Sequence, residues 1–216
     1  MKPKSPSRRP QIVLVAACAA VLAAPVSTAA LSAGPSLRMT PRVLEFGKGD
    51  ITLSGVIPSK RAGEEVQILS QPCRFTEPSQ IAAVTTKAGG AFRFRVQPML
   101  NTRFRVRWNQ SVSGVVAVGV RPIIELKRLA RGRYRVQITT TNPVFLNGKF
   151  VALQRSVGNR WVNVKRARLA KASPETAITV ISAVTISART TGRLRAVLPA
   201  AQAGCYLGAT SGAIGA

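Results

Sequence analysis

Arginine is the residue whose spacing points most directly to chemistry in this chain. It recurs at every second position in several segments, where it alternates with apolar residues. Guanidinium groups about 7 Å apart along a strand can hold phosphate or sulfate groups through paired hydrogen bonds. The candidate anion-binding residues are therefore Arg93, Arg95, Arg103, Arg105, Arg107, Arg133, Arg135, Arg193 and Arg195.

The other polar residues offer little for catalysis. The chain has no histidine, which removes the usual general base and the commonest metal ligand. The single aspartate, Asp50, follows Gly49 in a predicted turn, and Glu64 and Glu65 are neighbours that face opposite sides of a predicted strand. No CxxC or phosphate-loop motif occurs. We therefore expect no enzymatic activity, no cofactor and no metal site.

Composition gives a globular protein with a strong positive field. The 216 residues leave room for one large or two small domains, and 46% hydrophobic residues are enough to fill their cores. Lysine and arginine number 32 against 7 acidic residues, a net charge of +25. Such a field attracts polyanions. The competing interpretation, which the even spread of basic residues over the predicted strands favours, is that they solubilise the outer faces of sheets.

Residues 1–30 have the pattern of a Sec-type secretory signal peptide. Four basic residues within positions 2–9 precede an apolar run at 12–26, and small residues follow at 27–30. The apolar run is short against the roughly 20 residues that span a bilayer, and no later stretch is long enough. A lipoprotein anchored through Cys18 is the minor alternative, because Val15-Ala16-Ala17-Cys18 loosely resembles a lipobox. We expect a secreted or cell-surface protein with no transmembrane span in its mature part.

Removal of the signal peptide takes away four of the 32 basic residues and leaves 28 against 7 acidic ones, a net charge of +21. It also leaves two cysteines, Cys73 and Cys205. In an oxidising compartment these could form a disulfide that pins the two halves of the chain together. Two free thiols, or disulfides to other molecules, remain equally open, because the sequence does not establish the short Cα separation that a bond requires.

Apolar residues recur at the two-residue period of half-buried strands. The clearest stretch is residues 91–122, which contains three successive strand patterns ending at Arg121-Pro122. Earlier strands are predicted near 43–46, 51–55, 64–70 and 81–86, after a flexible lead-in at 31–40. The aromatic residues Phe92, Phe94, Phe104 and Trp108 fall on the buried phase. That placement disfavours nucleic-acid binding, which uses exposed aromatic rings for stacking.

The second half of the chain repeats this plan. Gly148–Gln154 aligns with Gly63–Leu69 at an offset of 85, and Thr191–Val197 aligns with Asn101–Arg107 at an offset of 90. A last strand is predicted at Cys205–Leu207, with the terminal GATSGAIGA as its weak end or a frayed tail. Two matching blocks in the same order predict tandem domains over residues 41–121 and 122–216.

Several motifs resemble the tandem immunoglobulin-like domains of exported bacterial proteins. They are the Gly89-Gly90 turn before Phe92-x-Phe94, the Asn101-Thr102 pair at the next strand, and Trp108 followed by Ser113. The resemblance implies an all-β fold of two tandem immunoglobulin-like antiparallel β-sandwiches. In that topology the fifth and sixth strands commonly lie in different sheets, which would divide the arginines over two outer faces.

The resemblance also implies an extracellular scaffold, adhesion or binding module with no chemistry of its own. The leading hypothesis is a non-catalytic exported protein with a structural or adhesion role at the cell surface. The alternative is a binding module that holds anionic cell-wall polymer or polysaccharide through its strand arginines. The expected partners are thus anionic cell-envelope polymers or another surface protein.

Overall fold

Strands make up nearly all the regular structure in this computed structural model, which describes residues 34–141, 146–170, 173–176 and 178–216. The only helical segments over these ranges are short 3-10 turns, Ala88–Gly90 (η1) and Ala200–Gln202 (η3). The all-β fold is therefore confirmed, and its strand pairs are antiparallel except for one parallel pair. The predicted signal peptide and Cys18 lie outside the described residues. Over the ranges given, no helix is long and apolar enough to cross a membrane.

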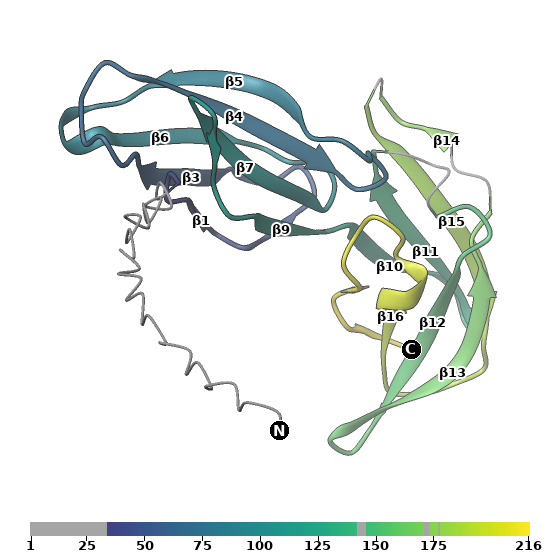
Figure 1. The fold of residues 1–216 in the computed structure, drawn as a ribbon. Coiled ribbons are helices and arrows are strands. Elements are labelled where there is room, and N and C mark those ends of the chain that lie inside the picture. The colour runs from purple at the N-terminus through teal and green to yellow at the C-terminus, as the bar shows by residue number, and fades with distance from the viewer. Residues whose placement is uncertain (1–33, 142–145, 171–172, 177) are drawn as a thin grey trace, which may run out of the picture. The chain divides into compact units, whose positions relative to one another are not determined.

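The N-terminal half of the chain forms two sheets, most strands of which are labelled in Figure 1. Its strands are β1 (Arg38–Thr40), β2 (Val43–Glu45), β3 (Ile51–Val56), β4 (Glu65–Pro72), β5 (Ser79–Thr85), β6 (Ala91–Val96), β7 (Thr102–Trp108), β8 (Ser111–Val112) and β9 (Val116–Arg121). One sheet has the order β1-β3-β6. The other has the order β2-β9-β7-β4-β5, with β8 paired to β7.

The C-terminal half also forms two sheets, and its strands pair only with one another in the described residues. They are β10 (Ile123–Ala130), β11 (Arg133–Thr140), β12 (Phe150–Val157), β13 (Arg160–Arg168), β14 (Ser173–Pro174), β15 (Val180–Ser187), β16 (Arg193–Leu198), β17 (Ala209–Thr210) and β18 (Ile214–Gly215). One sheet has the order β10-β11-β15-β14. The other has the order β13-β12-β16-β17, with β18 also paired to β16.

Alternation within the strands explains how these sheets bury a core. In β7 the side chains of Phe104 and Val106 are buried, while the arginines at positions 103, 105 and 107 are exposed. A side-chain period of two sends alternate residues to opposite faces of a sheet. The same rule places Tyr134, Val136 and Ile138 of β11 in the core of the C-terminal half.

The two halves share the same strand register. Ile68 of β4 pairs with Val106 of β7, and the residues at offsets of 85 and 90, Leu153 of β12 and Ala196 of β16, also pair. Strands β4 and β12 each carry a register shift at the equivalent point, after Ile68 in β4 and after Leu153 in β12. The sequence alignments thus correspond to a repeated pattern of strand pairing, including an irregularity that composition alone does not specify.

The predicted flexible lead-in at 31–40 is wrong for its last residues. Arg38–Thr40 is strand β1, and Met39 between them packs against the core of the N-terminal half. Before this strand, the amide and hydroxyl groups of Ser36 exchange hydrogen bonds with the backbone of Val56. A three-residue strand has one inward side chain, so it is too short to produce a recognisable period in the sequence.

Candidate functional site

The nine strand arginines do not form one array. Arg93 and Arg95 lie on β6, Arg103, Arg105 and Arg107 on β7, Arg133 and Arg135 on β11, and Arg193 and Arg195 on β16. Strands β6 and β7 belong to different sheets, and so do β11 and β16. The division that the immunoglobulin-like topology implies is therefore found in both halves. No extended ligand can touch all nine on one flat face.

A denser basic surface lies on strands β13, β12 and β16 of the C-terminal half. Figure 1 shows β12 and β13 as a long hairpin, and their register runs from Phe150 opposite Arg168 to Val157 opposite Arg160. These three strands carry seven basic residues and no acidic one, at positions 155, 160, 165, 166, 168, 193 and 195. Most of β13 is exposed.

Two half-buried aromatic rings support the arginines of this sheet. The guanidinium carbon of Arg195 lies 4.2 Å from the ring centre of Trp161, and its Nε donates to Oε1 of Gln154 at 2.9 Å. The guanidinium carbons of Arg166 and Arg168 lie 5.4 and 5.0 Å from the ring centre of Phe150. Stacking on a ring fixes a guanidinium plane while leaving its N–H groups able to donate.

Sequence analysis identified Arg193 and Arg195 here but not Arg166, Arg168 or their aromatic partners. In β13 Arg166 and Arg168 flank Ala167, but Lys165 directly precedes Arg166 and interrupts the strict alternation seen in the other strands. Phe150 and Arg168 are far apart along the chain and face each other only through the register of the hairpin. The one local indication in the sequence was the aromatic Trp161 directly after the basic Arg160.

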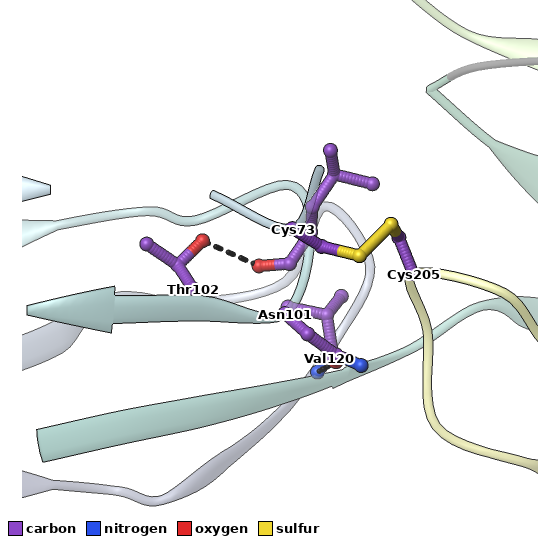
Figure 2. The surroundings of a disulfide bond; sticks show 6 residues. Cys73, Asn101, Thr102, Val120 and Cys205 are labelled. Carbon is purple, nitrogen blue, oxygen red and sulfur yellow. Dashed lines mark hydrogen bonds between the residues drawn. A yellow bond between two sulfur atoms is a disulfide. The ribbon is translucent and has the colours of Figure 1, made fainter. Parts of the chain in front are cut away.

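The second notable region is the junction between the two halves. Cys73 and Cys205 form a disulfide, with their Cα atoms 5.5 Å apart, so the first of the alternatives that the sequence left open is the one found. Figure 2 shows Asn101 beside this bond. Its backbone amide donates to the carbonyl oxygen of Cys205 at 3.0 Å, and its own carbonyl accepts from the amide of Cys73 at 2.8 Å. Its Oδ1 accepts from the amide of Val120 at 2.7 Å.

Residues near the disulfide make further contacts between the two halves. The amide of Leu207 donates to the carbonyl oxygen of Val120 at 2.8 Å. Gly119 leaves room for Leu207, because a Cβ at that position would lie 2.5 Å from Leu207 Cδ1. The rings of Phe46 and Tyr206 meet edge to face, with centres 6.3 Å apart. One hydrophobic cluster therefore includes residues of both halves.

Tyr206 is a group at the junction whose pKa is shifted by its surroundings. Its hydroxyl accepts a hydrogen bond from the amide of Thr141 at 2.9 Å, and only 3% of the residue is exposed. Burial raises the pKa of Tyr206 to about 12, although the hydrogen bond from Thr141 acts in the opposite direction. The phenol is neutral at physiological pH and remains a fixed part of the packing.

The predicted last strand at Cys205–Leu207 is wrong, because these residues lie in the connection between β16 and β17. Ser211 in the C-terminal half corresponds to Ser113 in the N-terminal half at an offset of 98, whereas β16 corresponds to β7 at an offset of 90. The connection is thus eight residues longer in the C-terminal half. The terminal residues are not a frayed tail, because they contain β17 and β18.

No known protein-family model matches the chain, and no curated protein matches its sequence. Within the described ranges, no three His, Cys, Asp or Glu side chains are grouped so that they could hold a metal ion.

Proposed function

We propose that this chain is an exported, non-catalytic protein with a structural or adhesion role at the cell surface, built from two immunoglobulin-like sandwiches held as one rigid unit. The observation that carries the proposal is the extended β16–β17 connection. It is bonded to the N-terminal half by the Cys73–Cys205 disulfide and by backbone hydrogen bonds to Asn101 and Val120. A flexible tether would need none of these bonds, whereas a unit that transmits force or presents a surface needs a fixed junction.

The disulfide also supports export. Disulfides persist in oxidising compartments and are rare where thiols are kept reduced. The apolar run at residues 12–26 supplies the matching export signal. Together with the repeated strand register, these features favour a tandem of immunoglobulin-like modules outside the cytoplasm.

The export step is tested by expressing the full chain with a C-terminal tag and separating cytoplasm, membrane, wall and medium. We expect an oxidised product outside the cytoplasm, with a mass that corresponds to cleavage near residue 30. Ser in place of Cys18 should leave its processing and location unchanged, since the lipoprotein route is the minor alternative. Full-length, reduced protein in the cytoplasm would contradict the proposal.

The structural role needs a separate measurement. Deletion of the gene should reduce adhesion or envelope integrity, and the Cys73→Ser/Cys205→Ser variant should restore less of it than the native chain does. NMR relaxation of the mature protein should give one tumbling time for both halves, and two after removal of the disulfide. Independent tumbling of the native halves would exclude a rigid unit.

A second candidate function is binding of anionic wall polymer or polysaccharide. The β13-β12-β16 sheet favours it, because its strands carry seven basic and no acidic residues and two of its aromatic rings orient arginines. Guanidinium groups bind phosphate and sulfate in paired hydrogen bonds, and salt screens the attraction.

Columns of sulfated and phosphate polymer test this second candidate. Three variants lose the same charge: Arg160, Arg166 and Arg168 to Gln, Arg103, Arg105 and Arg107 to Gln, and Arg93, Arg95 and Arg133 to Gln. We expect the first to elute at clearly lower salt than the other two. Equal elution of all three would mean that the polymer responds to net charge and not to this sheet.

A further inference from the structure

A cavity of about 840 Å³ opens in the C-terminal half, and none of the nine arginines identified from the sequence lines it. Its lining comes from the end of β10, the β10–β11 turn, the start of β11, strand β12 and the segment after β15. The lining residues are Arg128, Arg131, Gly132, Tyr134, Arg155, Arg189, Thr190, Thr191 and Ala216. Four of them are arginines and none is acidic.

Arg155 reaches this cavity from the inner face of its sheet. It pairs with Leu194 of β16, and directly paired residues on neighbouring strands share a face. Leu194 is fully buried in the core, so Arg155 occupies a core-facing position at the point where the sandwich opens. The equivalent position in the N-terminal half, at the offset of 85, holds Ser70. The C-terminal half has thus placed a charge where its counterpart has a small neutral side chain.

Tyr134 lines the same cavity. It is fully buried, and its hydroxyl group has no hydrogen-bond partner among the described residues. A buried hydroxyl without a partner is costly, so such a group usually indicates an unseen partner. A phenol can donate one hydrogen bond to an acceptor in the cavity.

The arginines of the cavity also lack an acidic side-chain partner among the described residues, since the ion pairs there join Lys48 to Glu45 and Lys127 to Glu125. Arg128 donates from Nη1 to the backbone oxygen of Ala216 at 2.7 Å and so is partly engaged. Arg131, Arg155 and Arg189 are left facing the cavity.

We propose that this cavity binds one tetrahedral oxyanion, a phosphate or sulfate group, through Arg131, Arg155 and Arg189, with the Tyr134 hydroxyl donating a further hydrogen bond. Such a group offers several acceptor oxygens and negative charge, which matches three guanidinium groups and a phenol. The cavity is within the range of small-molecule sites, about 300–1,000 Å³, and is larger than one inorganic anion. The natural ligand is therefore an ester that carries this group on a small polar body, which Thr190 and Thr191 can contact.

The site is distinct from the outer basic surface, because Arg155, the one basic residue it shares with strands β13, β12 and β16, lies on the inner face of that sheet. It differs from that surface in kind as well. A polymer bound on an outer face would be retained by many weak contacts, whereas this cavity should saturate with one small ligand.

Calorimetric titration of the mature protein with inorganic phosphate and inorganic sulfate, at constant ionic strength in chloride, tests the proposal. We expect saturation at one equivalent. Arg131→Gln/Arg155→Gln/Arg189→Gln should weaken binding at least about 100-fold, since each charge-assisted hydrogen bond is worth roughly tenfold or more. The control Arg93→Gln/Arg95→Gln/Arg133→Gln removes the same charge and should change affinity less than about threefold.

Tyr134→Phe keeps the test decisive if the triple variant does not fold. Loss of the hydroxyl should weaken binding about tenfold and leave thermal stability unchanged or higher, because no protein partner is lost. Glucose 6-phosphate and glucose 6-sulfate then separate the two sources of the group, and tighter binding of either ester than of its inorganic anion supports an ester ligand. Absence of saturable binding, equal weakening in both triple variants, or unchanged affinity in Tyr134→Phe would overturn the proposal.

Discussion

Ser113 and Ser211 make the same three hydrogen bonds in the two halves of the chain. Each backbone amide donates at 2.9 Å to a core residue, to the carbonyl of Val106 or of Ala196. Each hydroxyl accepts the amide of that same residue, at 3.0 and 2.9 Å, and donates to the carbonyl of the following glycine at 2.8 Å. The serine hydroxyl thus accepts a strand amide that would otherwise pair with the backbone of a neighbouring strand.

This equivalence predicts equal effects of Ser113→Ala and Ser211→Ala. Each change leaves a buried amide without its acceptor, so each should lower the free energy of unfolding by about 1–3 kcal/mol. Chemical denaturation of the mature protein measures the loss. The exposed Ser79→Ala serves as the control and should stay within about 0.5 kcal/mol of the native chain. A loss confined to one serine would show that the two positions are not equivalent.

Removal of the junction disulfide should destabilise the protein and uncouple its halves. The bond closes a loop between residues 132 positions apart, and constraint of so long a loop in the unfolded chain is worth about 3–5 kcal/mol. We expect Cys73→Ser/Cys205→Ser to lower the unfolding free energy by this amount. Calorimetry should show the single transition of the native protein broaden or divide. Unchanged stability would mean that the noncovalent contacts of Tyr206 and Leu207 alone fix the junction.

The sequence was sufficient where strands are long and half buried. The alternation of Arg103 to Trp108 correctly predicted which side chains of β7 face the core. It was insufficient for Arg38–Thr40, where the strand is too short to show a period. At Cys205–Leu207 an apolar run suggested a strand, but these residues contact the other half of the chain through the disulfide of Cys205, the ring of Tyr206 and the backbone amide of Leu207. Contacts across a junction leave no local period to detect.

The residues of the candidate sites also divide into those that the sequence predicts and those that it does not. Outward arginines such as Arg105 follow from alternation, because one strand suffices to place them. Arg155 does not, since its inward orientation depends on pairing with Leu194, and that register is set by residues far along the chain. The partnership of Phe150 with Arg168 likewise requires the hairpin register. Sites made by pairing between strands are therefore the part that the sequence did not predict.

Tyr206 makes stability depend on alkaline pH. Its pKa rises from an ordinary value of 10.0 to about 12 in the folded protein. The folded state thus favours the neutral phenol, so its contribution is complete below pH 10 and is lost as the pH rises toward 12. We expect the stability difference between the native protein and Tyr206→Phe to fall by about 2 kcal/mol over this window. Denaturation at several pH values measures it, and a constant difference would mean that the phenol is not buried.

Arg155 should lower stability while it serves anion binding. It faces the core side of its sheet beside Leu194, without an acidic partner among the described residues. An inward charge without a partner is costly, and apolar replacements at such sites are often stabilising by about 1–2 kcal/mol. We expect Arg155→Leu to raise the midpoint of thermal unfolding in buffer without phosphate.

Added phosphate should make the native protein more stable to heat than Arg155→Leu. A ligand at free concentration L that binds only the folded state stabilises it by RT ln(1 + L/Kd), so millimolar phosphate should raise the melting temperature of the native protein. It should not raise that of Arg155→Leu, which lacks one of the three binding guanidinium groups. Arg193→Leu is the matched control, because Arg193 is exposed on the neighbouring strand and lies outside the cavity. That variant should gain no stability in plain buffer and should keep the full response to phosphate. If Arg155→Leu is less stable than the native protein without phosphate, the arginine is a structural member of the core edge and not a ligand-binding group.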